Sequence, residues 1–230
     1  MVHASAPDER VLFIGNSLTA ANDLPAIVQA MSESVGRPLA CERVTFDGFS
    51  LEDHWHRGEG APGLNSAGSA RRAIARGGWS TVVLQQGPSA LPESRVLLVE
   101  YTRRFDAEIK RAGARTALYM VWPTADRRFD FDGVHASYEA AAKAVGGVFL
   151  PAGDALRRAS QLDRHPALFG ADGFHPSIAG SYLAALVITR TLTGRSIDDV
   201  PATLLLAGPS ASRVAIPDAD AIVLKRAASR

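Results

Sequence analysis

Short apolar runs rich in β-branched residues alternate along this chain with longer amphipathic stretches, and this alternation limits the folds open to it. The runs at 10–14 (RVLFI) and 80–85 (STVVLQ) are typical of strands buried on both faces of a parallel sheet. The stretches between such runs predict helices that cross from one strand to the next. We predict strands over 10–14, 39–46, 80–85, 116–122 and 147–150, and helices over 22–35, 69–76, 93–112, 134–145, 154–161 and 176–193.

This order of elements predicts an α/β protein, built as a three-layer α/β/α sandwich around a mainly parallel sheet of about five strands. The chain has 230 residues, which fits one domain. We expect the domain to span 1–195 and a C-terminal extension, 196–230, to pack on it. The extension holds an apolar segment near 204–207 and a terminal helix from Asp218. Ligand sites in such sheets lie at the carboxyl ends of the strands, here the segments 15–19, 46–50, 85–89 and the loop after Trp122.

Charge and cysteine content exclude several classes of function. The chain has 25 Lys and Arg against 24 Asp and Glu, and its arginine pairs are scattered, so no basic stripe predicts a nucleic-acid partner. Cys41 is the only cysteine, which excludes an internal disulfide and a cysteine metal cage.

No apolar run approaches the roughly 20 residues of a membrane span, and the segment 1–10 does not resemble a signal peptide. We expect a cytoplasmic protein, unless a longer precursor was trimmed, with no membrane partner; the oligomeric state stays open.

A serine follows the first predicted strand directly, in the segment 15–19 (GNSLT). A strand that turns into a helix presents this serine at the edge of the sheet, where the backbone N–H groups of the turn point outward and can bind an oxyanion. Serine is also a preferred helix N-cap, so capping is the alternative interpretation of Ser17. A phosphate loop is not indicated, because the segment has one glycine and no Gly-Lys-Ser/Thr follows it.

An aspartate and a histidine stand three residues apart near the other end of the domain, in 172–177 (DGFHPS). A nucleophilic serine needs a base that takes its proton, and the base needs a partner that holds its tautomer. On a turn entering a helix, Asp172 and His175 share one face, so one ring nitrogen can donate to the aspartate while the other faces the serine. The alternative is a plain Asp-Gly turn followed by a structural histidine. Pro176 is expected at the first position of the next helix.

Two other groups of residues resemble fragments of metal sites. His54 and His56 alternate along the chain, but no third ligand stands at a clear spacing, so a metal site is not favoured there. Asp126, Asp130 and Asp132 resemble part of a calcium loop that lacks its Gly-x5-Glu completion, so a solvated loop is favoured. We expect no metal and no organic cofactor.

Together, the serine and Asp-x-x-His motifs resemble those of the SGNH hydrolase superfamily, also called GDSL esterases and lipases. In that family a Gly-Asp-Ser-Leu block follows the first strand, and an Asp-x-x-His block precedes the last helix. Here 15–18 (GNSL) matches the first block, with Asn16 in place of the usual aspartate, and 172–175 (DGFH) matches the second. The resemblance covers about 10–194 and implies a flavodoxin-like sandwich. It also implies a catalytic triad of Ser17, Asp172 and His175.

The resemblance further implies an oxyanion hole with three donors. The backbone N–H groups of Ser17 and Gly48 are the first two, although Gly48 also fits a plain turn. The third donor in the family is usually the asparagine of a Gly-x-Asn-Asp block, which is absent from 85–89 (QQGPS). Alignment of the glycines places Ser89 at this position, whereas Gln86 has a side-chain amide that donates as asparagine does. We expect Gln86 to be the third donor, with Ser89 as the alternative.

We therefore predict a serine hydrolase that cleaves a small-molecule acyl ester through an acyl-enzyme intermediate. An O-acetyl group on a carbohydrate is a family-level candidate for the substrate. The alternatives are a non-catalytic ligand-binding module on the same fold, and an acyltransferase that uses the same triad. Near the loop after the fourth strand, Trp122 and Phe129 are candidates to line the pocket, with core packing the favoured role of Trp122.

Overall fold

The computed structural model describes residues 9–57, 69–207 and 212–229, so the Gly- and Pro-rich loop expected over 58–68 lies outside the described residues. Five strands form one sheet in the order β2-β1-β3-β4-β5, and every neighbouring pair is parallel. This sheet confirms the predicted flavodoxin-like arrangement. The strands are β1 (Glu9–Gly15), β2 (Leu39–Thr45), β3 (Thr81–Leu84), β4 (Arg115–Tyr119) and β5 (Val148–Leu150).

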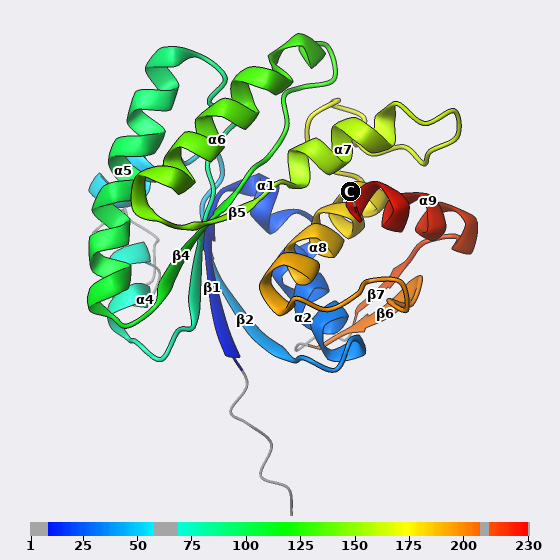
Figure 1. Cartoon of the computed structure of the whole chain (residues 1–230), viewed down its shortest axis with the longest axis horizontal. Coiled ribbons are helices and arrows are strands. Elements are labelled where there is room, and N and C mark those ends of the chain that lie inside the picture. The colour runs from blue at the N-terminus through cyan, green and yellow to red at the C-terminus, as the bar shows by residue number, and fades with distance from the viewer. Residues whose placement is uncertain (1–8, 58–68, 208–211, 230) are drawn as a thin grey trace, which may run out of the picture.

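Helices cover both faces of the sheet, as Figure 1 shows. This covering explains why the strands are apolar throughout rather than alternating, and it confirms the predicted three-layer sandwich. One helical layer consists of α4 (Ala70–Ala75), α5 (Pro92–Arg111) and α6 (Phe131–Val145). The other contains α2 (Leu24–Ser34), α7 (Ala152–Ser160) and α8 (Ile178–Thr193).

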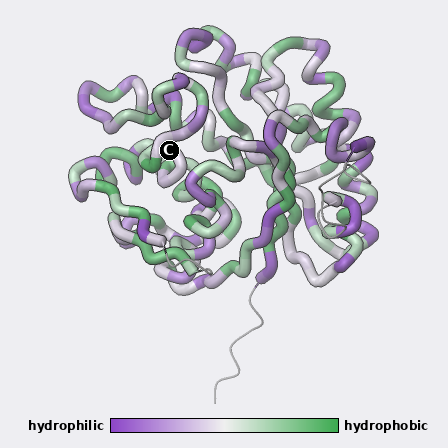
Figure 2. Tube along the Cα trace, turned by 180° about the vertical axis from the view of Figure 1, so that it is seen from behind, coloured by the Kyte–Doolittle hydropathy of each residue, from purple (hydrophilic) through white to green (hydrophobic). Residues whose placement is uncertain are grey.

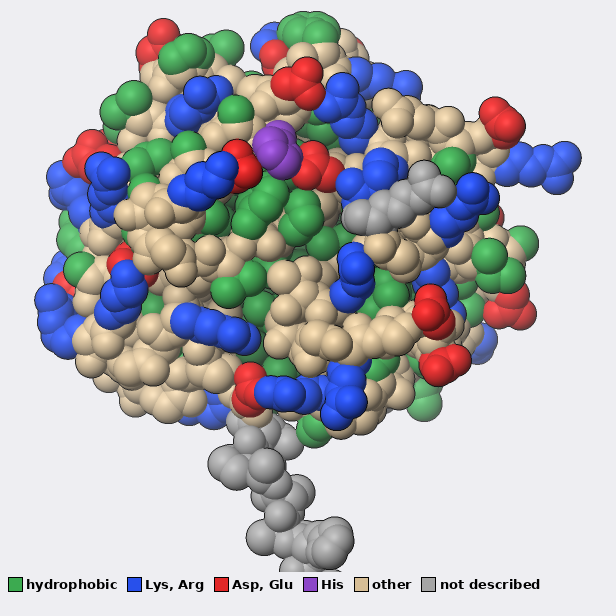
Figure 3. Space-filling view, in the orientation of Figure 1, with side chains coloured by type: hydrophobic (Ala, Val, Ile, Leu, Met, Phe, Trp, Pro, Cys, Tyr) green, Lys and Arg blue, Asp and Glu red, His purple; other side chains and the backbone are tan. Residues whose placement is uncertain are grey.

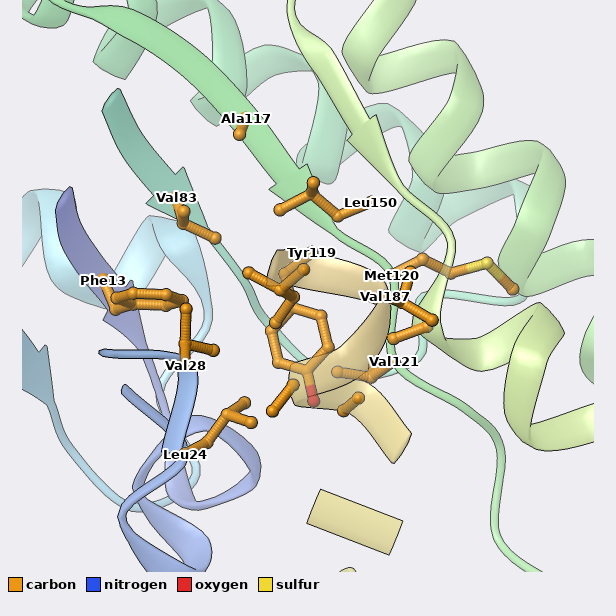
Figure 4. Packing of buried hydrophobic residues seen from close by; sticks show 14 of the residues in the cluster. Phe13, Leu24, Val28, Val83, Ala117, Tyr119, Met120, Val121, Leu150 and Val187 are labelled. Carbon is orange, nitrogen blue, oxygen red and sulfur yellow. The ribbon is translucent and has the colours of Figure 1, made fainter. Parts of the chain in front are cut away.

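The core between the sheet and the second helical layer is built from side chains of several strands. Figure 4 shows Phe13, Val83 and Tyr119, which come from three neighbouring strands, gathered with Val28 of α2 and Val187 of α8. All five are buried. Figure 2 shows hydrophobic residues concentrated in the middle of the molecule and hydrophilic ones on the outer helices and loops. Close packing of this kind gives the strand ends a rigid base.

The strand register brings the carboxyl ends of the strands to one edge of the sheet. Gly15 at the end of β1 pairs with Thr45 of β2, and Ile14 pairs with Leu84 of β3. The strands on either side of β1 are β2 and β3, so the strand order reverses between β1 and β3. Ligands bind at such a switch point in open α/β sheets. The segments after β1, β2 and β3 all begin there.

Two helix starts differ from the sequence expectation. The helix expected from residue 22 begins at Leu24, because Asn22 and Asp23 both have φ of 54°, in the left-handed region outside a helical path. Pro176 is not the first residue of α8, as expected, but precedes its N-cap. Ser177 takes the cap, and its side chain accepts an N–H of the first turn at 3.1 Å.

The sequence pattern gives no indication of α3 (Leu51–His56), a helix of six residues that follows β2. Its start is a reciprocal capping box. Ser50 Oγ accepts the N–H of Asp53 at 3.1 Å, and the Asp53 carboxylate accepts the N–H of Ser50 at 3.0 Å. Because the helix has fewer than two turns, no apolar period is long enough to reveal it.

The C-terminal extension forms an antiparallel hairpin and a helix. The hairpin consists of β6 (Thr203–Leu206), which is the expected apolar segment, and β7 (Ser212–Ala215), which was not expected. The helix α9 (Asp218–Ala228) packs against α7 and α8. The guanidinium groups of Arg158 and Arg190 donate to carbonyls of its last turn at 3.0 and 3.1 Å. These contacts support the proposal that the extension packs on the domain.

Acidic and basic side chains are interspersed over the face shown in Figure 3. Several form local ion pairs, such as Arg10 with Glu42 at 2.7 Å and Arg157 with Asp132 at 2.6 Å. Exposed pairs of this kind contribute little stability. Within 9–57, 69–207 and 212–229, no helix is both long enough and apolar enough to cross a bilayer.

Candidate active site

Ser17 lies at the edge of the sheet, in the turn between β1 and the short helix α1 (Ser17–Ala20). The N-cap of α1 is Asn16, whose side-chain oxygen accepts the N–H of Leu18 at 3.1 Å. Capping is therefore done by Asn16, and the Ser17 hydroxyl is left for another partner. Ser17 is partly exposed and lines a cavity.

Gln85, the first residue after β3, is fully buried and holds this turn. Its Oε1 accepts the N–H of Asn16 at 2.9 Å and the hydroxyl of Thr19 at 2.6 Å, and its Nε2 donates to Asn16 Oδ1 at 3.0 Å. A Cβ at position 15 would lie 2.3 Å from Gln85 Oε1, so Gly15 is required by the close approach of this amide. Sequence reasoning assigned Gln85 no role; its place at the end of a central strand was the available signal.

The three predicted triad residues form one line of hydrogen bonds. His175 Nε2 lies 2.9 Å from Ser17 Oγ, and His175 Nδ1 lies 2.5 Å from Asp172 Oδ2. Because the carboxylate accepts the proton of Nδ1, the lone pair of Nε2 faces the serine hydroxyl. The arrangement leaves the imidazole placed to take a proton from Ser17.

Asp172 is held by its own turn as well as by the histidine. Its Oδ1 accepts the backbone N–H groups of Phe174 and His175, each at 3.0 Å. The hydrogen bond from the His175 ring, followed by that from the Phe174 N–H, lowers the pKa of Asp172 to about 2. The side chain is half-exposed, so water screens this pairing. The carboxylate is therefore ionised at any neutral or mildly acidic pH.

Residues of the loop that follows β4 hold the turn that carries His175. Trp122 Nε1 donates to the carbonyl of Phe174 at 3.0 Å, and the N–H of Ala125 donates to the carbonyl of Gly173 at 2.8 Å. Gly173 has φ of +68°, which a glycine adopts without strain. Trp122 is fully buried, as favoured from the sequence, but it also anchors the site through its indole N–H.

Asn22 joins the serine segment to the histidine segment. Its Nδ2 donates to the carbonyl of Pro176 at 3.0 Å and to Ser181 Oγ at 2.8 Å. Asparagine tolerates the left-handed backbone found there better than most residues. Sequence reasoning missed this residue, because nothing local marks its contact with a segment so far along the chain.

Gln86 and Ser89, the two candidates for the third oxyanion donor, lie together on the cavity wall. Gln86 Oε1 accepts the N–H of Leu51 at 2.9 Å, and Gln86 Nε2 donates to Ser89 Oγ at 2.7 Å. The backbone of Gln86 is held by the buried hydroxyl of Tyr138, which donates to its carbonyl at 2.6 Å. The acceptor bond to Leu51 fixes the amide with its NH₂ group away from α3 and toward Ser89.

Gly48 lies on the same cavity, in the loop between β2 and α3. Its φ of +72° falls in the left-handed region that favours glycine. The loop is tied to the serine turn at two points: Asn16 Nδ2 donates to the carbonyl of Phe49 at 3.1 Å, and the N–H of Phe46 donates to the carbonyl of Gly15 at 3.2 Å. The three segments expected to supply oxyanion donors thus surround one cavity.

The cavity has a volume of about 520 Å³ and mixed walls. Leu91 and Phe174 supply apolar surface, while Arg127 and Asp130 form an ion pair of 2.6 Å on the wall. Phe129, a candidate lining residue, is 74% exposed and does not line this cavity.

Neither of the two groups that resemble fragments of metal sites, the histidine pair and the three aspartates, is arranged as a metal site in the structure. His54 Nε2 lies 2.8 Å from the carbonyl of Gly15, whereas His56 Nε2 lies 2.9 Å from the hydroxyl of Tyr101. Asp130 and Asp132 are each paired with an arginine. In the part of the chain that the structure describes, no group of three or more His, Cys, Asp or Glu side chains is placed to hold a metal ion.

No protein-family model matches this sequence, and no curated protein matches it. Solved structures do. A candidate SGNH hydrolase from Slackia heliotrinireducens matches with a TM-score of 0.64 at 26% identity, over 80% of this chain and 99% of that one. A catalytic variant of Axe2, an acetylxylan esterase from Geobacillus stearothermophilus, matches with a TM-score of 0.56 at 13% identity, over 83% of this chain and 94% of the other.

A DUF4886 family protein from Bacteroides uniformis matches with a TM-score of 0.75 at 20% identity, over 96% of this chain and 93% of that one. This coverage is larger than residues 1–195 alone can supply, so part of the C-terminal extension has a counterpart there. The match at 26% identity confirms the resemblance to the SGNH/GDSL superfamily that the two motifs indicated, and the other two show the same fold.

Proposed function

We propose that this chain, whose fold matches that of a candidate SGNH hydrolase, is an esterase that cleaves a small acyl ester through a covalent intermediate on Ser17. The observation that carries the proposal is the line of hydrogen bonds from Ser17 through His175 to Asp172. Each group has the chemistry its role requires: a hydroxyl as nucleophile, an imidazole as base and an ionised carboxylate that orients the imidazole.

In the proposed reaction, His175 takes the hydroxyl proton as Ser17 Oγ bonds to the ester carbonyl carbon, and the carbonyl π electrons move onto oxygen. The tetrahedral oxyanion then collapses, the bond to the alcohol oxygen breaks, and His175 gives its proton to that oxygen. His175 then deprotonates a water molecule as it attacks the acyl carbon, the bond to Ser17 Oγ breaks, and His175 returns the proton to Ser17 Oγ as the acid is released. Asp172 stays ionised and stabilises the imidazolium.

Three donors are proposed for the oxyanion: the N–H groups of Ser17 and Gly48 and the amide of Gln86. All three residues line the cavity. An amide NH₂ carries two protons, so Gln86 can keep its bond to Ser89 and still donate to a substrate oxygen. This supports Gln86 over Ser89, whose hydroxyl already donates to the carbonyl of Gly87 at 3.1 Å.

Several hydrogen-bonding side chains on the cavity wall support an alcohol group that carries hydroxyls, such as a sugar with an O-acetyl group. Ser50, Ser94 and the Arg127–Asp130 pair add hydrogen-bonding groups around the proposed donors. The shared fold with an acetylxylan esterase supports the same substrate class. Acyl transfer to an alcohol or amine would use the same residues, and product analysis with and without an acceptor separates it from hydrolysis.

The test compares hydrolysis of p-nitrophenyl acetate and of acetylated sugars by the wild type, Ser17→Ala and Ser34→Ala. Ser34 is exposed on α2 and serves as the matched control. The proposal expects Ser17→Ala to lose at least about 1000-fold in kcat while Ser34→Ala stays unchanged. Equal rates in all three folded proteins across several acyl lengths would overturn it and favour the binding module.

A further inference from the structure

His54 is a buried histidine that contacts the backbone just before the serine turn. It is 1% exposed and sits on α3, with its ring centroid 5.6 Å from that of Phe46 and 5.3 Å from that of Phe49. Its Nε2 lies 2.8 Å from the carbonyl oxygen of Gly15, two residues before Ser17. The proposed mechanism assigns this buried imidazole no role.

The surroundings fix the protonation of His54. Burial lowers the pKa of this imidazole to about 4, so the ring is neutral near neutral pH. The Gly15 oxygen is an acceptor only, so the single ring proton is on Nε2 and the side chain is a donor. Nδ1 is then a buried acceptor that has no hydrogen-bond partner within the described residues. An apolar ring would avoid this desolvation cost, so packing alone does not account for a histidine here.

The helix that carries His54 also touches the other donor segments. At its first residue, the N–H of Leu51 donates to Gln86 Oε1 at 2.9 Å. Just before it, the carbonyl of Phe49 accepts from Asn16 Nδ2 at 3.1 Å, and Gly48 is the neighbouring residue. The bond from His54 to Gly15 closes this set, because it links α3 to the backbone that places the N–H of Ser17.

We propose that His54 is a positioning residue. Its hydrogen bond to the Gly15 carbonyl holds α3 against the serine turn and so keeps the oxyanion donors in place relative to one another. This inference rests on the proposed esterase function and deepens it. Without this bond, the contacts of Asn16 with Phe49 and of Leu51 with Gln86 remain, but α3 loses its side-chain bond to the Gly15 carbonyl, so the oxyanion donors can shift relative to one another. A displacement of catalytic groups by about 1 Å can cost about 100-fold in rate, and we expect a loss of that order in kcat with KM changed by less than about threefold.

The experiment uses three variants of the full chain. His54→Phe keeps an aromatic ring among Phe46 and Phe49 but removes the donor, whereas His54→Gln keeps an N–H near the position of Nε2. His56→Gln is the control, because His56 is exposed on the same helix and contacts Tyr101 outside the site. Folding is checked by circular dichroism and urea unfolding. The readouts are kcat, KM and the rate at which a fluorophosphonate labels Ser17.

The inference expects His54→Phe to lose about 100-fold in kcat and labelling rate, His54→Gln to recover most of the loss, and His56→Gln to match the wild type. A folded His54→Phe with wild-type kcat overturns it, as does a loss that His54→Gln does not rescue.

If His54→Phe does not fold, nitrogen NMR of the wild type decides: a proton on Nε2 at pH 7 supports the inference and a proton on Nδ1 overturns it. A wild type that is neither active nor labelled overturns the proposed function itself, whereas a labelled wild type with unaffected variants overturns the role of His54 alone.

Discussion

His175 Nε2 lies 2.9 Å from Ser17 Oγ, although 158 residues separate the two in the chain. They meet because the turn after β1 and the turn before α8 end at the same edge of the sheet. Asn22 links the two segments by donating to the carbonyl of Pro176 at 3.0 Å. The fold therefore assembles the proposed base and nucleophile from opposite ends of the domain.

Asp172→Asn is expected to lower kcat by about 100- to 10,000-fold, because an amide in place of the carboxylate no longer stabilises the imidazolium and favours the wrong ring tautomer. The new side-chain oxygen can still accept the N–H groups of Phe174 and His175, so the turn should hold. Steady-state kinetics check this, with Asp163→Asn on the exposed surface as the control. Equal kcat in both variants would show that Asp172 has no catalytic role.

Gln86→Glu separates the two candidates for the third oxyanion donor. The new carboxylate still accepts the N–H of Leu51, but it has no N–H to donate and adds negative charge beside the oxyanion. We expect kcat to fall by about 100- to 1000-fold, and Ser89→Ala to lose less than about tenfold. The opposite order of losses in kinetic assays would assign the role to Ser89.

Gln85→Leu tests the buried amide beneath the serine turn. The substitution leaves the N–H of Asn16 and the hydroxyl of Thr19 buried without this acceptor. We expect the free energy of unfolding to fall by about 2–4 kcal/mol, since each unsatisfied group costs about 1–3 kcal/mol. Urea unfolding measures it, and Gln161→Leu on the surface should stay within about 0.5 kcal/mol of the wild type. A change in Gln85→Leu as small as that of the control would show that the network contributes nothing.

The buried His54 makes stability depend on pH. Its pKa falls from 6.5 to about 4 on folding, mainly through burial, so the unfolded chain binds a proton between these values and the folded chain does not. This part of the stability is complete above about pH 6.5 and is lost as the pH decreases toward 4, by about 3 kcal/mol in total. Urea unfolding of the wild type and His54→Gln across pH 4–7 should give curves that converge toward acid pH. Parallel curves would show that His54 is not buried in its neutral form.

The fold, and the motifs that bring Ser17, Asp172 and His175 together, were predictable because their signals are local. Each buried strand is a continuous apolar run, and Ser17 and His175 stand at a strand end and at a helix start. The sequence left open whether Ser17 caps the next helix, because serine is a preferred N-cap. Only the structure shows that Asn16 caps α1 and frees the serine.

The supporting residues could not be predicted, because their partners are far along the chain. Gln85 and Gln86 are adjacent, identical in type and both buried, yet Gln85 holds the serine turn while Gln86 lines the cavity, and nothing in the sequence distinguishes the two. His54 was considered only as half of a metal pair. Its contact with Gly15 depends on α3, a helix too short to leave a period in the sequence.

Covalent labelling shows whether Ser17 is the nucleophile. The protein is treated with a fluorophosphonate, digested, and mapped by peptide mass spectrometry, with Ser17→Ala treated in parallel. We predict one adduct, on Ser17, formed as esterase activity is lost, and no adduct in the variant. An adduct on another residue, or full loss of activity with Ser17 unmodified, would contradict it.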